Sequence, residues 1–126
     1  MKDKIPAIRT ITMPTDTNPY GSVFGGWLMG QMAQGCAALA AQHSKRKCVV
    51  VGANELRFER PVNVGDELSV FVEFAKIGRS SMIVRAEAYS RERHSDEMMK
   101  AASGEYTFVA LDENNQPAEV RQKVLF

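Results

Sequence analysis

Apolar side chains recur at helical spacing in one long segment of the chain. No proline occurs between Val23 and His43. The bulky residues at steps of three and four are Phe24, Leu28, Met32, Cys36 and Leu39. This spacing predicts a helix over about residues 23–43 with one apolar stripe.

The same segment carries a second stripe, built from small residues. Its members follow at steps of four, three, four and four: Gly26, Gly30, Ala33, Ala37 and Ala41. A glycine inside a helix costs about 0.5–1 kcal/mol relative to alanine, so the stripe needs a compensating role. We expect it to allow close approach of another backbone, as in a helix embraced by a curved sheet.

The rest of the chain alternates apolar and polar residues with a period of two, which is typical of strands. The predicted strands cover about residues 5–12, 47–60, 68–77, 82–89 and 99–111. Turn-forming residues separate them at 14–22, 64–66 and 90–97, and Gly78 ends the third strand. The pattern predicts an α+β fold: one strand, the long helix, then a meander of four antiparallel strands with the helix on its apolar face.

Length and composition indicate one globular domain over residues 1–126, with a loose C-terminal tail at about 117–126. A formal net charge of +1 argues against general nucleic-acid binding, since the basic residues are spread out apart from Lys45-Arg46-Lys47. The N-terminus is charged, and no eighteen apolar residues run together. We therefore expect a cytoplasmic protein that does not enter the membrane.

Several kinds of active site find little support in the sequence. There are two histidines, His43 and His94, and no G-x-S-x-G or phosphate-loop motif, so a Ser-His-Asp arrangement is disfavoured. The spacing of Cys36, His43 and Cys48 fits no usual zinc pattern, and we expect no metal site. We expect the two cysteines to be free, buried thiols and His43 to stabilise the helix C-terminus.

The polar loop before the helix ends in the pair Gly25-Gly26. At a helix start the first backbone N–H groups have no partner inside the helix, and the macrodipole favours negative charge there. These amides could therefore form an oxyanion hole. In the plainer alternative, the two glycines let the chain turn tightly before the helix.

The whole loop and helix start resemble the signature of hotdog-fold acyl-CoA thioesterases, particularly the bacterial broad-range YciA-type enzymes. The matching residues are Asp16-Thr17-Asn18, Gly21, Phe24-Gly25-Gly26-Trp27 and Met29. Two later segments, Phe58–Asp66 and Gly78–Ser81, also match, so the resemblance spans about residues 8–112. It implies a hotdog fold, in which a five- or six-stranded antiparallel sheet wraps a long helix.

The resemblance also implies which residues act. Asn18 would position the thioester or water, and the amides at Gly25 and Gly26 would polarise the thioester carbonyl. The turn Arg79-Ser80-Ser81 would lie near the CoA moiety, or be a plain hairpin turn. The implied reaction hydrolyses acyl-CoA between two subunits of a homo-oligomer, a dimer or a trimer of dimers. It needs no cofactor, because CoA is part of the substrate.

One position departs from the family pattern. Relatives carry an aspartate or glutamate in the helix as general base or nucleophile, where this chain has Ala33. Losing a general base commonly lowers the rate by about 10²–10⁴-fold. Ala33 would then be a close-packing position.

Few residues could take over this role. Asn54 alternates with Leu56 and Phe58 and should face the helix, where it could orient water but not deprotonate it. Glu55 would point to the opposite face unless a bulge intervenes, and Asp16 better suits a turn; of the two, Glu55 ranks first. Gln34 lies about 100° round the helix from Ala33. The competing hypothesis is a non-catalytic acyl-CoA-binding or sensing protein.

Overall fold

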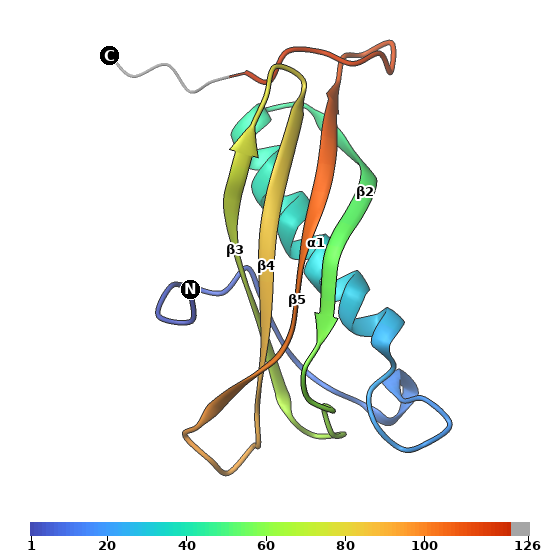
Figure 1. The fold of residues 1–126 in the computed structure, drawn as a ribbon, viewed down its shortest axis with the longest axis vertical. Coiled ribbons are helices and arrows are strands. Elements are labelled where there is room, and N and C mark those ends of the chain that lie inside the picture. The colour runs from blue at the N-terminus through green and yellow to red at the C-terminus, as the bar shows by residue number, and fades with distance from the viewer. Residues whose placement is uncertain (122–126) are drawn as a thin grey trace.

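In the computed structural model, which describes residues 1–121, one helix lies across a five-stranded antiparallel sheet (Figure 1). The elements are β1 (Ile8–Ile11), the short 3-10 helix η1 (Pro14–Asp16), α1 (Gly25–Ser44), β2 (Lys47–Phe58), β3 (Glu67–Ile77), β4 (Ser81–Arg91) and β5 (Met98–Leu111). The predicted α+β hotdog fold is thereby confirmed, with five strands.

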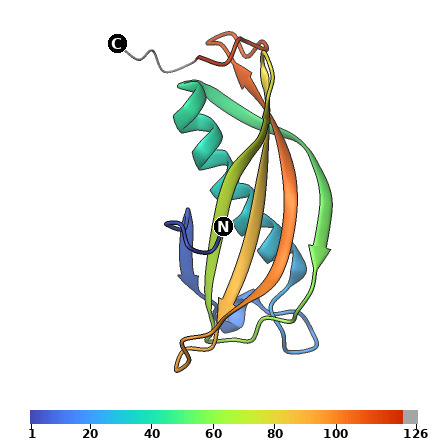
Figure 2. The ribbon, with the colours of Figure 1, turned by 60° about the vertical axis from the view of Figure 1, so that its left-hand side comes forward.

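The sheet curls around α1, which packs on its concave face (Figure 2). Side chains along a strand alternate between the two faces of the sheet, so every second residue enters the core. The residues of β4 that do so are all fully buried: Met82, Val84, Ala86 and Ala88. The helix contributes Leu28, Met32, Cys36 and Ala40. The predicted apolar stripe is therefore correct apart from Phe24, which caps the helix and is exposed.

The strand order differs from the predicted meander. It is β1-β3-β4-β5-β2, so only β3, β4 and β5 follow one another across the sheet. The chain leaving β2 crosses to β3 on the other side of the sheet, and β2 becomes an edge strand paired with β5. The pattern of apolar residues defines strands and faces, but it carries no information on which strand lies beside which.

The stripe of small residues does not face the sheet. Gly26, Gly30 and Ala41 are exposed, and Ala33 and Ala37 are half-buried. Close approach to the sheet occurs instead at Gly35, where an added Cβ would lie 3.2 Å from Val70 Cγ1. Within one chain the stripe is thus left free on the flank of α1.

The C-terminal segment is tied to the fold as far as it is described. The N–H of Ala118 donates to Ala110 O at 2.8 Å, the N–H of Val120 donates to Arg79 O at 2.7 Å, and Val120 is buried. The predicted loose tail is therefore wrong for residues 117–121, and residues 122–126 lie outside the described part. None of the helices in residues 1–121 has the length and apolar character to cross a membrane, and a cytoplasmic location stays a prediction.

Candidate active site

The loop that leads into α1 is closed by its own hydrogen bonds. Asn18 Oδ1 accepts from the N–H of Tyr20 at 2.8 Å and of Ser22 at 3.2 Å, and its Nδ2 donates to Ser22 Oγ at 3.0 Å. Gly21 has φ +94°, a conformation that favours glycine. The predicted site residue Asn18 therefore lies beside the helix start, with its amide group engaged in holding this loop.

Further backbone contacts place the end of the loop. The N–H of Phe24 donates to Asp16 O at 2.7 Å, and the N–H of Val23 donates to Val62 O at 2.8 Å. The carboxylate of Asp16 accepts from Met13 N–H at 3.0 Å, so the predicted turn-forming role of Asp16 is confirmed. These contacts fix the direction in which α1 begins.

The first two amides of α1 are free. Within residues 1–121, neither the N–H of Gly25 nor that of Gly26 donates to a protein acceptor, and the N-cap residue Phe24 supplies no side-chain cap. Neither glycine has a positive φ, so a tight left-handed turn is not the reason for the pair. Two unpaired donors at the positive end of the helix dipole are suited to bind a developing negative charge.

A groove of about 330 Å³ opens beside the helix start and is lined by Gly25. The first turn of α1 and the chain at the end of β2 form its walls, which are Ser22, Val23, Gly25, Leu28 and residues 58–62. The Phe58 ring, which is 50% exposed, would lie 3.7 Å from a Cβ placed at Gly25. Glu59 and Arg60 also line the groove; their sequence marked them only as members of the Phe58–Asp66 motif.

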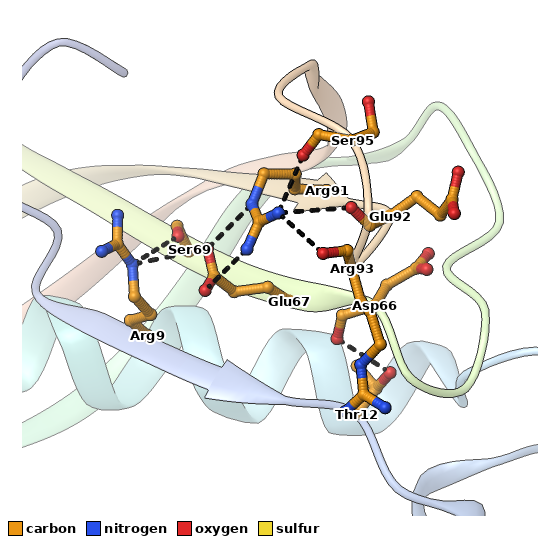
Figure 3. Close-up of polar contacts among 9 residues, drawn as sticks. All are labelled: Arg9, Thr12, Asp66, Glu67, Ser69, Arg91, Glu92, Arg93 and Ser95. Carbon is orange, nitrogen blue, oxygen red and sulfur yellow. Dashed lines mark hydrogen bonds and ion pairs between the residues drawn. The ribbon is translucent and has the colours of Figure 1, made fainter.

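A buried threonine holds the connection that forms one wall of the groove. Thr12 Oγ1 lies 2.7 Å from Asn63 O and 3.1 Å from Asp66 O. Figure 3 shows the adjoining charged cluster, in which Glu67 lies between two arginines, 3.6 Å from Arg9 and 3.2 Å from Arg91. This network ties β1, β3 and β4 together.

Ala33 lies two turns along α1 from the free amides and is half-buried against the core. One turn before it, the Tyr106 hydroxyl donates to Met29 O at 2.9 Å, and burial raises the pKa of Tyr106 to about 12. Burial also raises the pKa of the nearby Cys36 thiol to about 12, so this thiol stays protonated at neutral pH. Cys36 and Cys48 are free thiols, but Cys48 is only half-buried.

Asn54 does not face the helix, contrary to prediction. A bulge in β2 places Asn54 opposite Glu105, whereas Phe58 lies opposite the buried Ala102. Because buried and outward side chains alternate along β5, Asn54 lies on the outer face with Glu105. The bulge contains Glu55, whose φ is +55°.

Glu55 is not directed into the groove. Its carboxylate lies 3.7 Å from the guanidinium of Arg57, and both side chains are exposed. Gln34, on α1, is exposed as well. Neither residue stands in for a carboxylate at Ala33 within one chain.

The turn Gly78–Ser81 lies at the other end of the molecule from the helix start (Figures 1 and 2). A 20-residue helix spans about 30 Å, and this length separates the two ends. Within one chain, the predicted CoA-contacting residues Arg79, Ser80 and Ser81 therefore lie far from the helix start at Gly25 and Gly26. No cluster of three or more potential metal ligands occurs in residues 1–121.

Comparison with known proteins assigns the family. The family model of the thioesterase superfamily matches residues 20–96. The chain belongs to the thioesterase superfamily. The matched region contains both the helix start and the groove, and the resemblance noted in the sequence is confirmed.

Individual thioesterases agree over most of the chain. An uncharacterized acyl-CoA thioester hydrolase of Zymomonas mobilis is 48% identical over 115 residues, which cover 91% of this chain and 77% of that protein. The acyl-CoA thioester hydrolase YciA of Salmonella typhimurium is 35% identical over 113 residues, covering 87% and 85%. A mutant of a hexameric broad-specificity acyl-coenzyme A thioesterase, with alanine in place of an aspartate, is 34% identical with a TM-score of 0.90, covering 94% of this chain and 88% of that one.

Proposed function

We propose that this thioesterase-superfamily protein hydrolyses acyl-CoA thioesters to a carboxylic acid and CoA. The observation that carries the proposal is the pair of free amides at Gly25 and Gly26 beside an open groove. Relatives named as acyl-CoA thioester hydrolases support the choice of substrate.

The chemistry follows from these two donors. The thioester carbonyl oxygen accepts hydrogen bonds from the amides of Gly25 and Gly26, which stabilise the oxyanion that forms when water adds to the carbonyl carbon. The carbon–sulfur bond then breaks, and the CoA thiolate leaves and takes a proton from solvent. Water is the only co-reactant, so the proposed reaction needs no bound cofactor.

The water lacks the helix carboxylate that the family resemblance implies. A missing general base costs about 10²–10⁴-fold in rate, while stabilisation of the oxyanion continues to act. Glu59 lines the groove, and within one chain its carboxylate is the acidic group of the groove wall that could accept the proton of the water. We propose that hydrolysis is slow, because Ala33 occupies the position where the family resemblance implies a basic carboxylate. The similar thioesterase with alanine in place of an aspartate shows that such a replacement is compatible with the fold in that protein.

We propose further that the site lies between two subunits. The edge strand β2 exposes a run of large apolar side chains, Val49, Val50 and Val51, at 44, 52 and 60%. A long apolar edge strand invites pairing with another chain, and two copies of β2 related by a two-fold axis would pair antiparallel. The hexameric assembly of the similar thioesterase supports a homo-oligomer built from such dimers.

A second candidate function is acyl-CoA binding without turnover, as in a sensor. It is favoured by Ala33 alone, since the carbonyl-binding amides would serve either a binder or an enzyme. The two candidates differ in whether bound thioester is cleaved.

The test measures release of free CoA from a panel of acyl-CoAs of increasing chain length. We expect a rate above background from the natural chain and a kcat about 10²–10⁴-fold higher in Ala33→Asp, because a carboxylate on this face of α1 can take a proton from water. Ala38→Asp, at an exposed position one turn and a residue further on, is the matched control and should gain nothing. Background rates in both the unmodified chain and a folded Ala33→Asp would contradict hydrolysis and argue for the binding function instead.

A further inference from the structure

The groove beside the helix start combines apolar walls with two charged side chains. The apolar residues come from the loop, from the first turn of α1, and from the end of β2 with the chain that follows it: Val23, Leu28, Phe58, Pro61 and Val62. Three of them, Val23, Leu28 and Val62, are buried, whereas the Phe58 ring is half-exposed. A volume of about 330 Å³ has room for about ten groups of the size of a water molecule, at about 30 Å³ each. The groove therefore suits a short carbon chain.

The two charged residues of the groove are Glu59 and Arg60. Both side chains are exposed, and none of the ion pairs within residues 1–121 uses either of them. The backbone N–H of Arg60 donates to Ala101 O at 3.3 Å, which anchors this residue on β5. The backbone of Arg60 is thus held in place, while its guanidinium has no carboxylate partner in the described part of the chain.

The distribution of charge in the groove favours a substrate that brings a second anionic group. In the proposed reaction the amides of Gly25 and Gly26 hold the thioester carbonyl at the positive end of the helix dipole. The carboxylate of Glu59 could accept the proton of the water, so Arg60 is the charged group that a neutral acyl chain leaves without a partner. An arginine guanidinium pairs with a carboxylate through two parallel hydrogen bonds, which makes it selective for that group.

We infer that the preferred acyl group is short and ends in a second carboxylate, and that Arg60 is the residue that selects it. The inference rests on the proposed function, because the acyl group belongs to the thioester held at Gly25 and Gly26. Succinyl and adipyl groups, with about seven and about nine heavy atoms, fit a groove with room for about ten. The substrate is then the CoA monothioester of a dicarboxylic acid, and a saturated acyl chain of the same length binds more weakly.

The experiment compares non-cleavable analogues of succinyl-CoA and butyryl-CoA, which have acyl chains of the same length and differ in the terminal carboxylate. Calorimetry measures their binding to the assembled protein. We expect the unmodified chain to bind the succinyl analogue about fivefold more tightly, which is the upper range for one exposed ion pair, and rising salt to reduce this preference. Arg60→Gln should remove the preference and leave the binding of the butyryl analogue unchanged.

Arg57→Gln is the matched control. Arg57 is exposed and close to Arg60 in the chain, but its guanidinium lies 3.7 Å from the Glu55 carboxylate and it does not line the groove. Its replacement should change neither affinity. Free CoA is the control ligand, because a role of Arg60 in holding the phosphates of CoA would weaken all three ligands alike in Arg60→Gln.

Equal binding of the two analogues by the unmodified chain would overturn the inference, as would a preference that persists in a folded Arg60→Gln or an equal loss of all three ligands. None of these results depends on turnover. If the succinyl analogue binds more tightly through Arg60 but succinyl-CoA is never cleaved, the proposed hydrolysis alone fails. If succinyl-CoA and butyryl-CoA are cleaved with equal kcat/KM and their analogues bind equally, this inference alone fails.

Discussion

At the residue scale, the side chain of Asn18 is engaged in the loop that leads into α1. Both ends of its amide are engaged inside the loop, with the oxygen accepting two backbone N–H groups and the nitrogen donating to Ser22. Family resemblance implied contact with the thioester or water. The geometry favours a positioning role, in which Asn18 sets the place of the helix start.

Aspartate at position 18 separates the two roles. Asn18→Asp keeps the oxygen that accepts from Tyr20 and Ser22 and replaces the Nδ2 donor by a second carboxylate oxygen, which can accept from the Ser22 hydroxyl. We therefore expect its melting temperature to stay close to that of the unmodified chain and its kcat to stay within about threefold. Asn18→Ala loses all three bonds and should lower the free energy of unfolding by about 1–3 kcal/mol, since each half-buried hydrogen bond contributes about 0.5–1.5 kcal/mol. If Asn18→Asp lost as much kcat as Asn18→Ala while keeping its melting temperature, the nitrogen would contact the substrate.

Glu55 adopts a left-handed backbone conformation, which is unfavourable for a residue that has a Cβ atom. A non-glycine residue at φ +55° costs roughly 1–2 kcal/mol, which glycine does not incur. We predict that Glu55→Gly is more stable than Glu55→Val by about 2 kcal/mol in urea denaturation, because valine is branched at Cβ. At Arg57, beyond the bulge, the order should reverse, with Arg57→Val above Arg57→Gly. The same order at both positions would contradict the left-handed conformation of Glu55.

The sequence predicted the helix-start amides but misplaced Asn54, for a reason visible at residues 54–57. Strict alternation assigns Asn54 to the face of Leu56 and Phe58. The bulge inserts one extra residue and moves Asn54 to the other face. Glutamate rarely adopts the left-handed backbone conformation, so the residue type at position 55 did not indicate a bulge. A prediction of which face a side chain lies on fails near a bulge, because it assumes that every residue along the strand alternates between the two faces.

At the scale of elements, the helix and strands were predictable because their periodicities are long and uninterrupted. The predicted helix over about 23–43 became Gly25–Ser44, and its end is set by Lys45 in a left-handed conformation at φ +58°. The placement of β2 at the sheet edge was not predictable, since it depends on how the segment 59–66 crosses the molecule. That crossing is fixed by tertiary contacts such as the one between Thr12 and Asn63.

One arginine holds the loop that connects β4 and β5. Arg91 bonds the carboxylate of Glu67 on one side and the carbonyl oxygens of Glu92, Arg93 and Ser95 on the other, at 2.8–3.3 Å (Figure 3). Arg91→Gln should loosen residues 92–97, because glutamine cannot reach both sides, and amide hydrogen exchange there should quicken at least tenfold. Arg93→Gln is the control, since only its backbone takes part. Unchanged exchange in Arg91→Gln would show that the hairpin is held by its strands alone.

At the scale of the whole molecule, a single chain presents half of each proposed site. The free amides of Gly25 and Gly26 lie at one end and the turn Gly78–Ser81 at the other, while an apolar edge strand and a stripe of small residues on α1 stay uncovered between them. One arrangement would explain all of these features: pairing of two chains through β2, which covers the edge and joins the two ends. Neither periodicity nor composition could have indicated this, because each describes one chain.

The most direct measurement is a crystal structure of the assembled protein with a non-cleavable acyl-CoA analogue that keeps the carbonyl and replaces the sulfur by a methylene group. We predict the carbonyl oxygen within about 3.1 Å of the N–H of Gly25 or Gly26, the usual range for such donors, with the rest of the ligand crossing to a second subunit. Amides of Gly25 and Gly26 bonded to groups of the partner chain, with the ligand elsewhere, would contradict the account.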